Sequence, residues 1–149
     1  MIKVGKPKGQ QVMRTSAMSA TFLVMYCVLL FDVVGVLGDV GTAASYDPPY
    51  LQLNNEATRC GGYSEDQFPP GELFAAVSDG LWDNGASCGR KYRVRCISGP
   101  KRPCKVRSIV VQVVDLCSHD PCPATLLLSN KAFTAISKID AKVNVEYAQ

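Results

Sequence analysis

Cysteine is the residue type that most limits what this 149-residue chain can fold into. Six of its seven cysteines come after residue 59. An even number of cysteines in a short secreted domain predicts disulfide bonds. Six cysteines can pair in fifteen ways, and spacing alone does not choose among them. We therefore expect a small, disulfide-stapled domain, whose bonded residues are Cys60, Cys88, Cys96, Cys104, Cys117 and Cys122.

The first 38 residues have the order of a secretory signal. A basic stretch comes first, and an apolar run from Ala20 to Phe31 follows it. Val36 and Gly38 are small enough to occupy the −3 and −1 sites of a signal peptidase. We predict a signal peptide over residues 1–38 and a mature domain over residues 39–149.

A membrane anchor is the alternative for this apolar run. A spanning helix needs about 20 apolar residues, and Asp32 interrupts the run early. The run would extend to Leu37 if Asp32 were tolerated. With cleavage, Cys27 leaves with the signal and the mature protein is not embedded in a membrane.

The charge of the mature part is balanced. The whole chain carries a net charge of +3, but from Asp39 onward twelve Lys and Arg face twelve Asp and Glu. Binding of nucleic acid needs a surplus of cations against the phosphates. Net charge therefore gives no support to a nucleic-acid partner.

Short strands separated by turns account for most of the mature part. The stretch from Tyr92 to Ile97 alternates between apolar and basic residues, and Ser108 to Leu116 is apolar on both faces, which is typical of a central strand. Asp79-Gly80 and Asn84-Gly85 indicate turns, and Ser129 can cap a single short helix. These features predict a small closed β-barrel. The expected strands are 41–46, 73–77, 92–97, 108–116, 125–128 and 143–147, with a long loop over 51–71.

Four segments together resemble one family, the plant expansin-like proteins with a family-45-endoglucanase-like domain. This group includes the plant natriuretic peptides and the blight-associated small secreted proteins. The resemblance covers residues 41–149. Its segments are GTAASYDPPYL (41–51), LWDNGASCGRKYRVRC (81–96), VVDLCSHDPC (113–122) and LLLSNKAFTAI (126–136).

The resemblance implies a fold, a location and a set of bridges. The fold is a mainly β, six-stranded double-psi β-barrel with one short helix, and the location is the apoplast. By analogy with expansins the bridges are Cys60–Cys88 and Cys96–Cys104, which leaves Cys117–Cys122. Expansins carry a second, carbohydrate-binding domain, whereas we expect a single domain here.

The resemblance also bears on catalysis. Glycoside hydrolysis usually needs two carboxylates, and the family's two positions match Asp115 and Leu127. Leucine can neither donate nor accept a proton, so we predict that the protein is not an enzyme. Asp115 is a candidate for ligand binding, and the alternative is that it accepts hydrogen bonds from nearby backbone or from Tyr46.

Basic side chains form the second candidate site. Lys91, Arg93 and Arg95 share one face of their predicted strand, where they can contact an acidic wall polysaccharide or a receptor. The alternative is a solvated face that pairs with acids elsewhere.

Aromatic side chains form the third candidate site. Tyr46 and Trp82, together with Tyr50 and Tyr63, are candidates for a sugar-stacking platform, and the alternative is that they anchor the core and loops.

No metal or cofactor is predicted. Cys117, His119 and Cys122 have the spacing of half a zinc site, but in an oxidising compartment the two thiols should pair instead. The single histidine is then a solvated loop residue.

We therefore expect a secreted, monomeric, non-catalytic protein. The resemblance to plant natriuretic peptides implies an extracellular signal in water and solute homeostasis, with activity in the segment from Gly41 to about Cys96 and a plasma-membrane receptor as partner. The chief alternative is a wall-modifying protein that binds cell-wall polysaccharide without hydrolysing it. A residual glycosidase or transglycosylase is a third.

Overall fold

The computed structural model describes residues 38–50, 58–61 and 67–149. Nearly all of the predicted signal peptide lies outside the described residues, and so do Cys27, Tyr63 and most of the predicted loop over 51–71. In the described part of the chain no helix is both long and apolar enough to cross a membrane.

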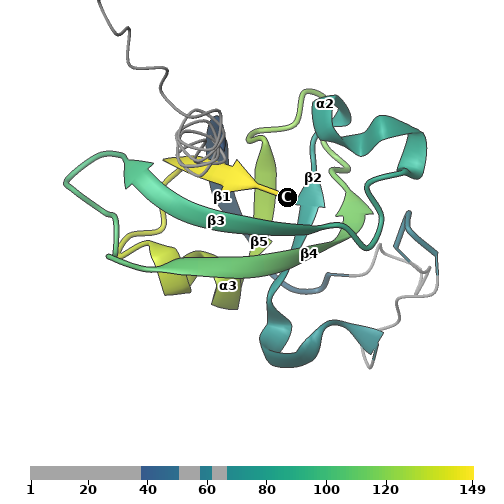
Figure 1. Cartoon of the computed structure of the whole chain (residues 1–149), viewed down its shortest axis with the longest axis horizontal. Helices are drawn as coiled ribbons and strands as arrows, with labels where there is room; N and C mark the ends of the chain where they lie inside the picture. Colours follow the sequence, from purple (N-terminus) through teal and green to yellow (C-terminus); the bar gives the residue numbers. More distant parts are fainter. Residues whose placement is uncertain (1–37, 51–57, 62–66) are drawn as a thin grey trace, which may run out of the picture. The chain divides into compact units, whose positions relative to one another are not determined.

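Six strands close into a barrel (Figure 1). They are β1 (Asp39–Tyr46), β2 (Phe74–Val77), β3 (Lys91–Ser98), β4 (Ser108–Leu116), β5 (Leu126–Ser129) and β6 (Val143–Ala148). Around the barrel the order is β1-β5-β2-β4-β3-β6, and β6 pairs with β1. β1–β5 and β2–β4 are parallel, and the other pairs are antiparallel. The predicted six-stranded double-psi β-barrel is confirmed, and closure leaves no unpaired sheet edge.

Two long strands of the barrel wall, β3 and β4, form an antiparallel hairpin (Figure 1). β3 alternates as predicted, with Tyr92, Val94 and Cys96 buried and the three cations exposed. β4 departs from the prediction of two apolar faces. Its first half alternates, and Val110 is 47% exposed on the outside. Only the later stretch is buried on both faces, where the segment around Arg59 contacts it.

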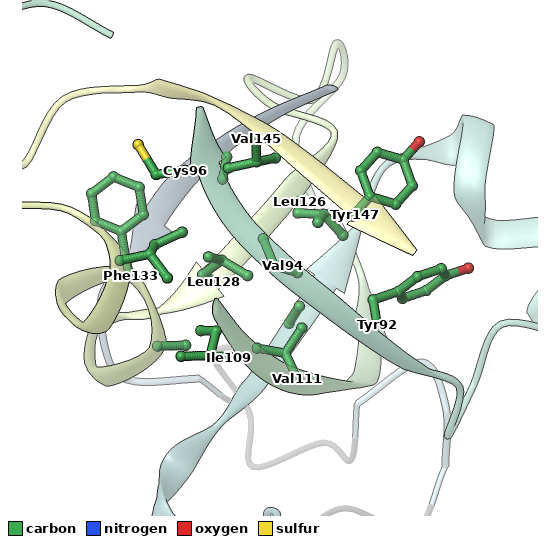
Figure 2. Packing of buried hydrophobic residues seen from close by; sticks show 14 of the residues in the cluster. Tyr92, Val94, Cys96, Ile109, Val111, Leu126, Leu128, Phe133, Val145 and Tyr147 are labelled. Atoms are coloured by element: carbon green, nitrogen blue, oxygen red, sulfur yellow. The ribbon is translucent and has the colours of Figure 1, made fainter. Parts of the chain in front are cut away.

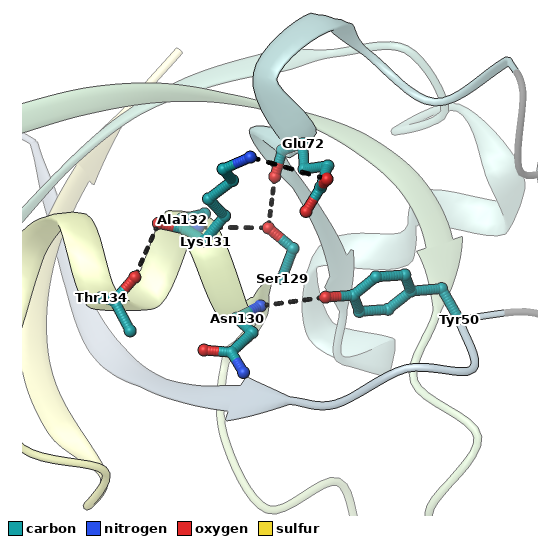
Figure 3. Close-up of polar contacts among 7 residues, drawn as sticks. All are labelled: Tyr50, Glu72, Ser129, Asn130, Lys131, Ala132 and Thr134. Carbon is teal, nitrogen blue, oxygen red and sulfur yellow. Dashed lines mark hydrogen bonds and ion pairs between the residues drawn. The ribbon is translucent and has the colours of Figure 1, made fainter.

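Apolar side chains from all six strands fill the barrel, and α3 (Asn130–Ile136) adds Phe133 and Ile136 to them. Figure 2 shows Phe133 together with core residues of β3, β4, β5 and β6. α3 is the predicted helix, and Ser129 caps it, since its Oγ accepts a hydrogen bond from the Ala132 N–H at 3.2 Å. The same hydroxyl donates to the Glu72 carbonyl (Figure 3). This one serine therefore joins the helix start to the segment before β2.

A second helix was not predicted. α2 (Asp79–Trp82) is a single turn in which Leu81 and Trp82 pack against the core. It ends where Asp83 and Asn84 take positive φ values of 52° and 51°, which Asp and Asn adopt more readily than most residues. The turn signals were therefore correctly placed, and the segment between them forms one helical turn whose two apolar side chains are partly buried against the core.

Three disulfides join the six cysteines, in the pairing that the resemblance implied. Cys60–Cys88 fastens the segment 58–61 to the turn before β3 and closes a separation of 28 residues. In the chain-entropy model a loop of that length adds about 3.5 kcal/mol. Cys96–Cys104 closes the β3–β4 connection, and Cys117–Cys122 closes the loop after β4.

Candidate functional site

Asp115 lies near the end of β4 and pairs with Ala76 of β2. The β2–β4 register shifts between Ala75 and Ala76, so that Ala75 pairs with Val113 and Ala76 with Asp115. Ala75 and Val113 belong to the main core, whereas Ala76 belongs to a separate small cluster. The shift therefore places Asp115 beside Ala76, outside the main core, where it is only 6% exposed.

The Asp115 carboxylate binds backbone. Its Oδ1 accepts hydrogen bonds from the N–H groups of Arg59 and Leu116, each at 2.8 Å. Burial raises the pKa of Asp115, and the two backbone hydrogen bonds act in the opposite direction. Asp115 thus accepts hydrogen bonds from nearby backbone, which was the alternative to a role in ligand binding.

Tyr46 lies near Asp115 without a hydrogen bond to it among the described contacts. Burial, and next the negative charge of Asp115, raise the pKa of the Tyr46 hydroxyl far above its ordinary value. The hydroxyl oxygen is buried and has no hydrogen-bond partner among the described residues. The structure therefore brings together two of the predicted site residues, Asp115 and Tyr46.

Leu127 occupies the same face of the barrel wall as Asp115. In the strand register Ala76 pairs with both residues, with Asp115 on one side and Leu127 on the other. Two strand spacings put the Asp115 and Leu127 backbones about 9.5 Å apart. The register therefore makes residue 127 the position across Ala76 from Asp115.

Leucine fills that position with apolar surface. Leu127 is 5% exposed and packs with Ala76, Ala124 and the Cys117–Cys122 disulfide. Among the described residues the only charge that shifts the pKa of Asp115 is that of Arg59. Among the described residues this face therefore holds one carboxylate, that of Asp115, with the apolar side chain of Leu127 across Ala76 from it.

The predicted aromatic platform is not assembled from Tyr46, Tyr50 and Trp82. Tyr46 and Tyr50 meet edge to face at 5.0 Å, and Tyr50 packs against the fully buried Phe74 at 4.8 Å. Phe68 stacks on Phe74 at 4.4 Å. Both tyrosines therefore anchor an aromatic cluster, and the two phenylalanines, which sequence reasoning missed, are its centre. The apolar run of the short β2 strand, which is buried throughout, was the signal for Phe74.

Trp82 lies in a different place. It lines a hollow of about 550 Å³ together with Arg90 and Tyr92. Arg90 forms an ion pair with Asp83 at 2.8 Å at the rim of this hollow, and the hydrogen bond to Asp83 raises the Arg90 pKa. Trp82 is half-buried and packs against the barrel core.

Lys91, Arg93 and Arg95 do share a face, as predicted. All three are exposed and line a shallow hollow of about 690 Å³ on the outside of β3, β4 and β6. Arg95 forms an ion pair and a hydrogen bond with Glu146 of β6. Lys91 and Arg93 have no ion pair among the described residues.

The half zinc site is absent for a chemical reason. Cys117 and Cys122 are bonded to each other, so neither sulfur is available as a thiolate ligand, and His119 is exposed on the loop between them.

Comparison with known protein sequences finds two groups of relatives. A family model described as "Lytic transglycolase" matches residues 74–147. An EG45-like domain containing protein of Citrus jambhiri is 40% identical over 114 residues, 73% of this chain and 79% of that protein. EG45-like domain containing protein 2 of Arabidopsis thaliana is 40% identical over 104 residues, 68% of this chain and 72% of that protein. Expansin-B4 of the same plant is 35% identical over 135 residues, 84% of this chain and 50% of the expansin.

Solved structures give the same result for the fold. An expansin of Clavibacter michiganensis superposes with a TM-score of 0.53 at 28% identity, over 73% of this chain and 48% of the expansin. A mutant of the same expansin, solved in complex with cellohexaose, superposes with a TM-score of 0.52 at 29% identity. The chain therefore spans about half the length of the expansins it matches.

Proposed function

The chain belongs to the EG45-like, expansin-related proteins, and on that premise we propose that it is a secreted, non-hydrolytic protein with an extracellular signalling role in water and solute homeostasis. The resemblance to plant natriuretic peptides supports the signalling role. The signal-like segment that ends at Gly38 and the three disulfides support action in the apoplast.

The row Asp115–Ala76–Leu127 carries the non-hydrolytic part of the proposal. The pair of positions that could hold an acid and a base across a substrate holds one acid and one leucine. A mechanism that used Asp115 alone would still need the carboxyl group to touch its glycan. Asp115 is almost fully buried, and its Oδ1 is bound by two backbone N–H groups. For this reason the transglycosylase chemistry that the family model's description suggests is not part of the proposal.

Binding of cell-wall polysaccharide is the second candidate function. The solved complex of the related expansin with cellohexaose favours it. That complex concerns a protein about twice as long as the aligned region of this chain. The wall-loosening form of this candidate therefore has less support than simple binding.

Swelling of protoplasts separates the two candidates, because protoplasts have no wall. Mature protein, with its fold confirmed by circular dichroism, should change protoplast volume at low concentration. The same protein after reduction and alkylation is the control and should be inactive. Folded protein that leaves protoplast volume unchanged but sediments with purified wall polymers would refute the signalling role in favour of the second candidate.

A further inference from the structure

The balanced net charge conceals a separation of charge along the chain. Residues 39–83 contain eight Asp and Glu and a single cation, Arg59. Residues 84–114 contain eight cations and neither Asp nor Glu. These cations are Arg90, Lys91, Arg93, Arg95, Lys101, Arg102, Lys105 and Arg107. All but Arg90 lie on β3 or on its connection to β4. The domain as a whole is neutral, but its β3–β4 hairpin is strongly basic, and we call it the basic hairpin.

The strand part of this basic hairpin presents charge beside apolar surface. Arg93 lies between Val110 of β4 and Ala148 of β6 in the strand register. These three residues line the 690 Å³ hollow with Lys91 and Arg95. Since Arg95 is paired with Glu146, Lys91 and Arg93 supply the unpaired charge of the hollow.

The tip of the hairpin carries two more cations, and both have an unfavourable backbone conformation. Lys101 and Arg102 are both exposed and have positive φ values of 56° and 53°. Asn-Gly fits two adjacent positive-φ positions far more readily than residues with long side chains. Cys96–Cys104 closes this connection. The disulfide therefore holds a connection that exposes two positive side chains. Uncharged residues such as Asn and Gly would fit the backbone at these two positions better.

The spacing of these cations suits a long ligand. An eight-residue strand such as β3 spans about 27 Å, and the tip extends the basic surface beyond its end. Arg107 is exposed and has no ion pair among the described residues. A small anion would contact only one or two of these cations, whereas an extended polyanion can contact several along the hairpin.

We propose that the basic hairpin binds a linear acidic polysaccharide built of uronic-acid residues. The inference rests on the proposed extracellular location, where wall polymers are the polyanions at hand. Each uronic acid offers a carboxylate to Lys or Arg and an apolar ring face to Val110 and Ala148. The exposed apolar residues of the hairpin are aliphatic, so it lacks the stacking platform that single-stranded nucleic acid uses. A closed barrel also offers no edge for strand addition by a peptide.

Titration of mature protein with polygalacturonate, followed by calorimetry, tests this proposal. The fully methyl-esterified polymer has the same backbone without the charges, and we expect it not to bind. The triple variant Arg93→Gln, Lys101→Gln, Arg102→Gln should bind about 100-fold more weakly, because each cation near an anionic surface contributes about fivefold.

Two further variants control for folding and for overall charge. Arg93→Lys, Lys101→Arg, Arg102→Lys keeps the charges and should bind within a few-fold of wild type. Lys131→Gln, Lys138→Gln, Lys142→Gln removes the same charge outside the hairpin and should also bind within a few-fold of wild type. Equal losses in the two glutamine variants, or equal binding of the esterified polymer, would overturn the proposal. Tighter binding of duplex DNA or of phosphatidylserine vesicles at the same salt concentration would overturn it in favour of another polyanion.

Protoplast swelling keeps this inference separate from the proposed function. Polymer binding by a protein that causes no swelling would refute the signalling role and leave the hairpin site in place. Swelling by a protein that does not bind the polymer would refute the hairpin site and leave the signalling role in place.

Discussion

Replacement of Asp115 by alanine should destabilise the barrel without removing any activity. In the structure its Oδ1 accepts two backbone hydrogen bonds, from Arg59 and Leu116, each at 2.8 Å. The substitution leaves both N–H groups without that acceptor, and an unsatisfied buried donor costs about 1–3 kcal/mol. Arg59 is an exposed residue whose N–H can turn to water, so most of the loss comes from Leu116. We expect a decrease of about 2–3 kcal/mol in the free energy of unfolding.

Asp115→Asn is the matched control for this prediction. Asparagine keeps an acceptor oxygen of the same reach, so its free energy of unfolding should stay within about 1 kcal/mol of wild type at neutral pH. Urea unfolding followed by circular dichroism, with the disulfides intact, measures all three proteins. If the alanine and asparagine variants lose equal stability, the Asp115 carboxylate oxygen is not the acceptor that holds these two segments.

The same pair of proteins gives a pH dependence of known sign. Burial raises the pKa of Asp115 in the folded protein, so the folded state keeps the proton to a higher pH than the unfolded chain does. The stability that wild type gains from this proton is present below the ordinary pKa of about 3.9 and is lost as the pH rises through the folded-state value. The stability of wild type relative to Asp115→Asn should therefore fall as the pH rises above the ordinary pKa of about 3.9. A relative gain as the pH rises would mean that the pKa of Asp115 is lowered by folding.

Three further predictions concern the helix cap, the bridges and the processing site. Ser129→Ala should cost about 1–2 kcal/mol of unfolding free energy, because the Ala132 N–H loses its cap, whereas Thr134→Ala on the exposed side of the same helix should cost less than about 0.5 kcal/mol. Removal of Cys60–Cys88 should cost about 3.5 kcal/mol and removal of Cys117–Cys122 about 2 kcal/mol, because their separations are 28 and 5 residues; the reverse order in urea unfolding would contradict the chain-entropy model here. Intact mass spectrometry of secreted protein should give a chain that begins at Asp39 and has six hydrogens fewer than its reduced form, and a retained N-terminus or free thiols would argue against the predicted processing.

Local patterns in the sequence predicted the elements well. The alternation from Tyr92 to Ile97 is β3 with its two faces correctly assigned, and Ser129 begins the helix that it was expected to cap. Both features depend on residues close together in the chain, where side-chain direction follows directly from backbone periodicity. α2 was missed because its two apolar side chains, Leu81 and Trp82, are partly buried against the barrel core, a contact that depends on the rest of the fold.

Relations between distant residues were beyond local patterns. The register that places Asp115 and Leu127 on either side of Ala76 joins three strands, two of them parallel and far apart in the chain. Residue type alone suggested that Tyr46 and Trp82 belong together, yet they lie in different clusters because each follows its own strand or turn. The separation of charge along the chain can be read from the sequence. That most of the cations lie on one hairpin follows only from the fold.

Release of reducing ends tests the central claim, that this domain is not a glycoside hydrolase, most directly. Purified mature protein should be incubated with β-glucans and with peptidoglycan, in parallel with Asp115→Ala and with Leu127→Asp, which restores the family carboxylate. We expect no release by any of the three, because an enzyme needs tuned pKa values and a positioned substrate as well as two carboxylates. Turnover by the wild-type protein that disappears in Asp115→Ala would contradict the claim.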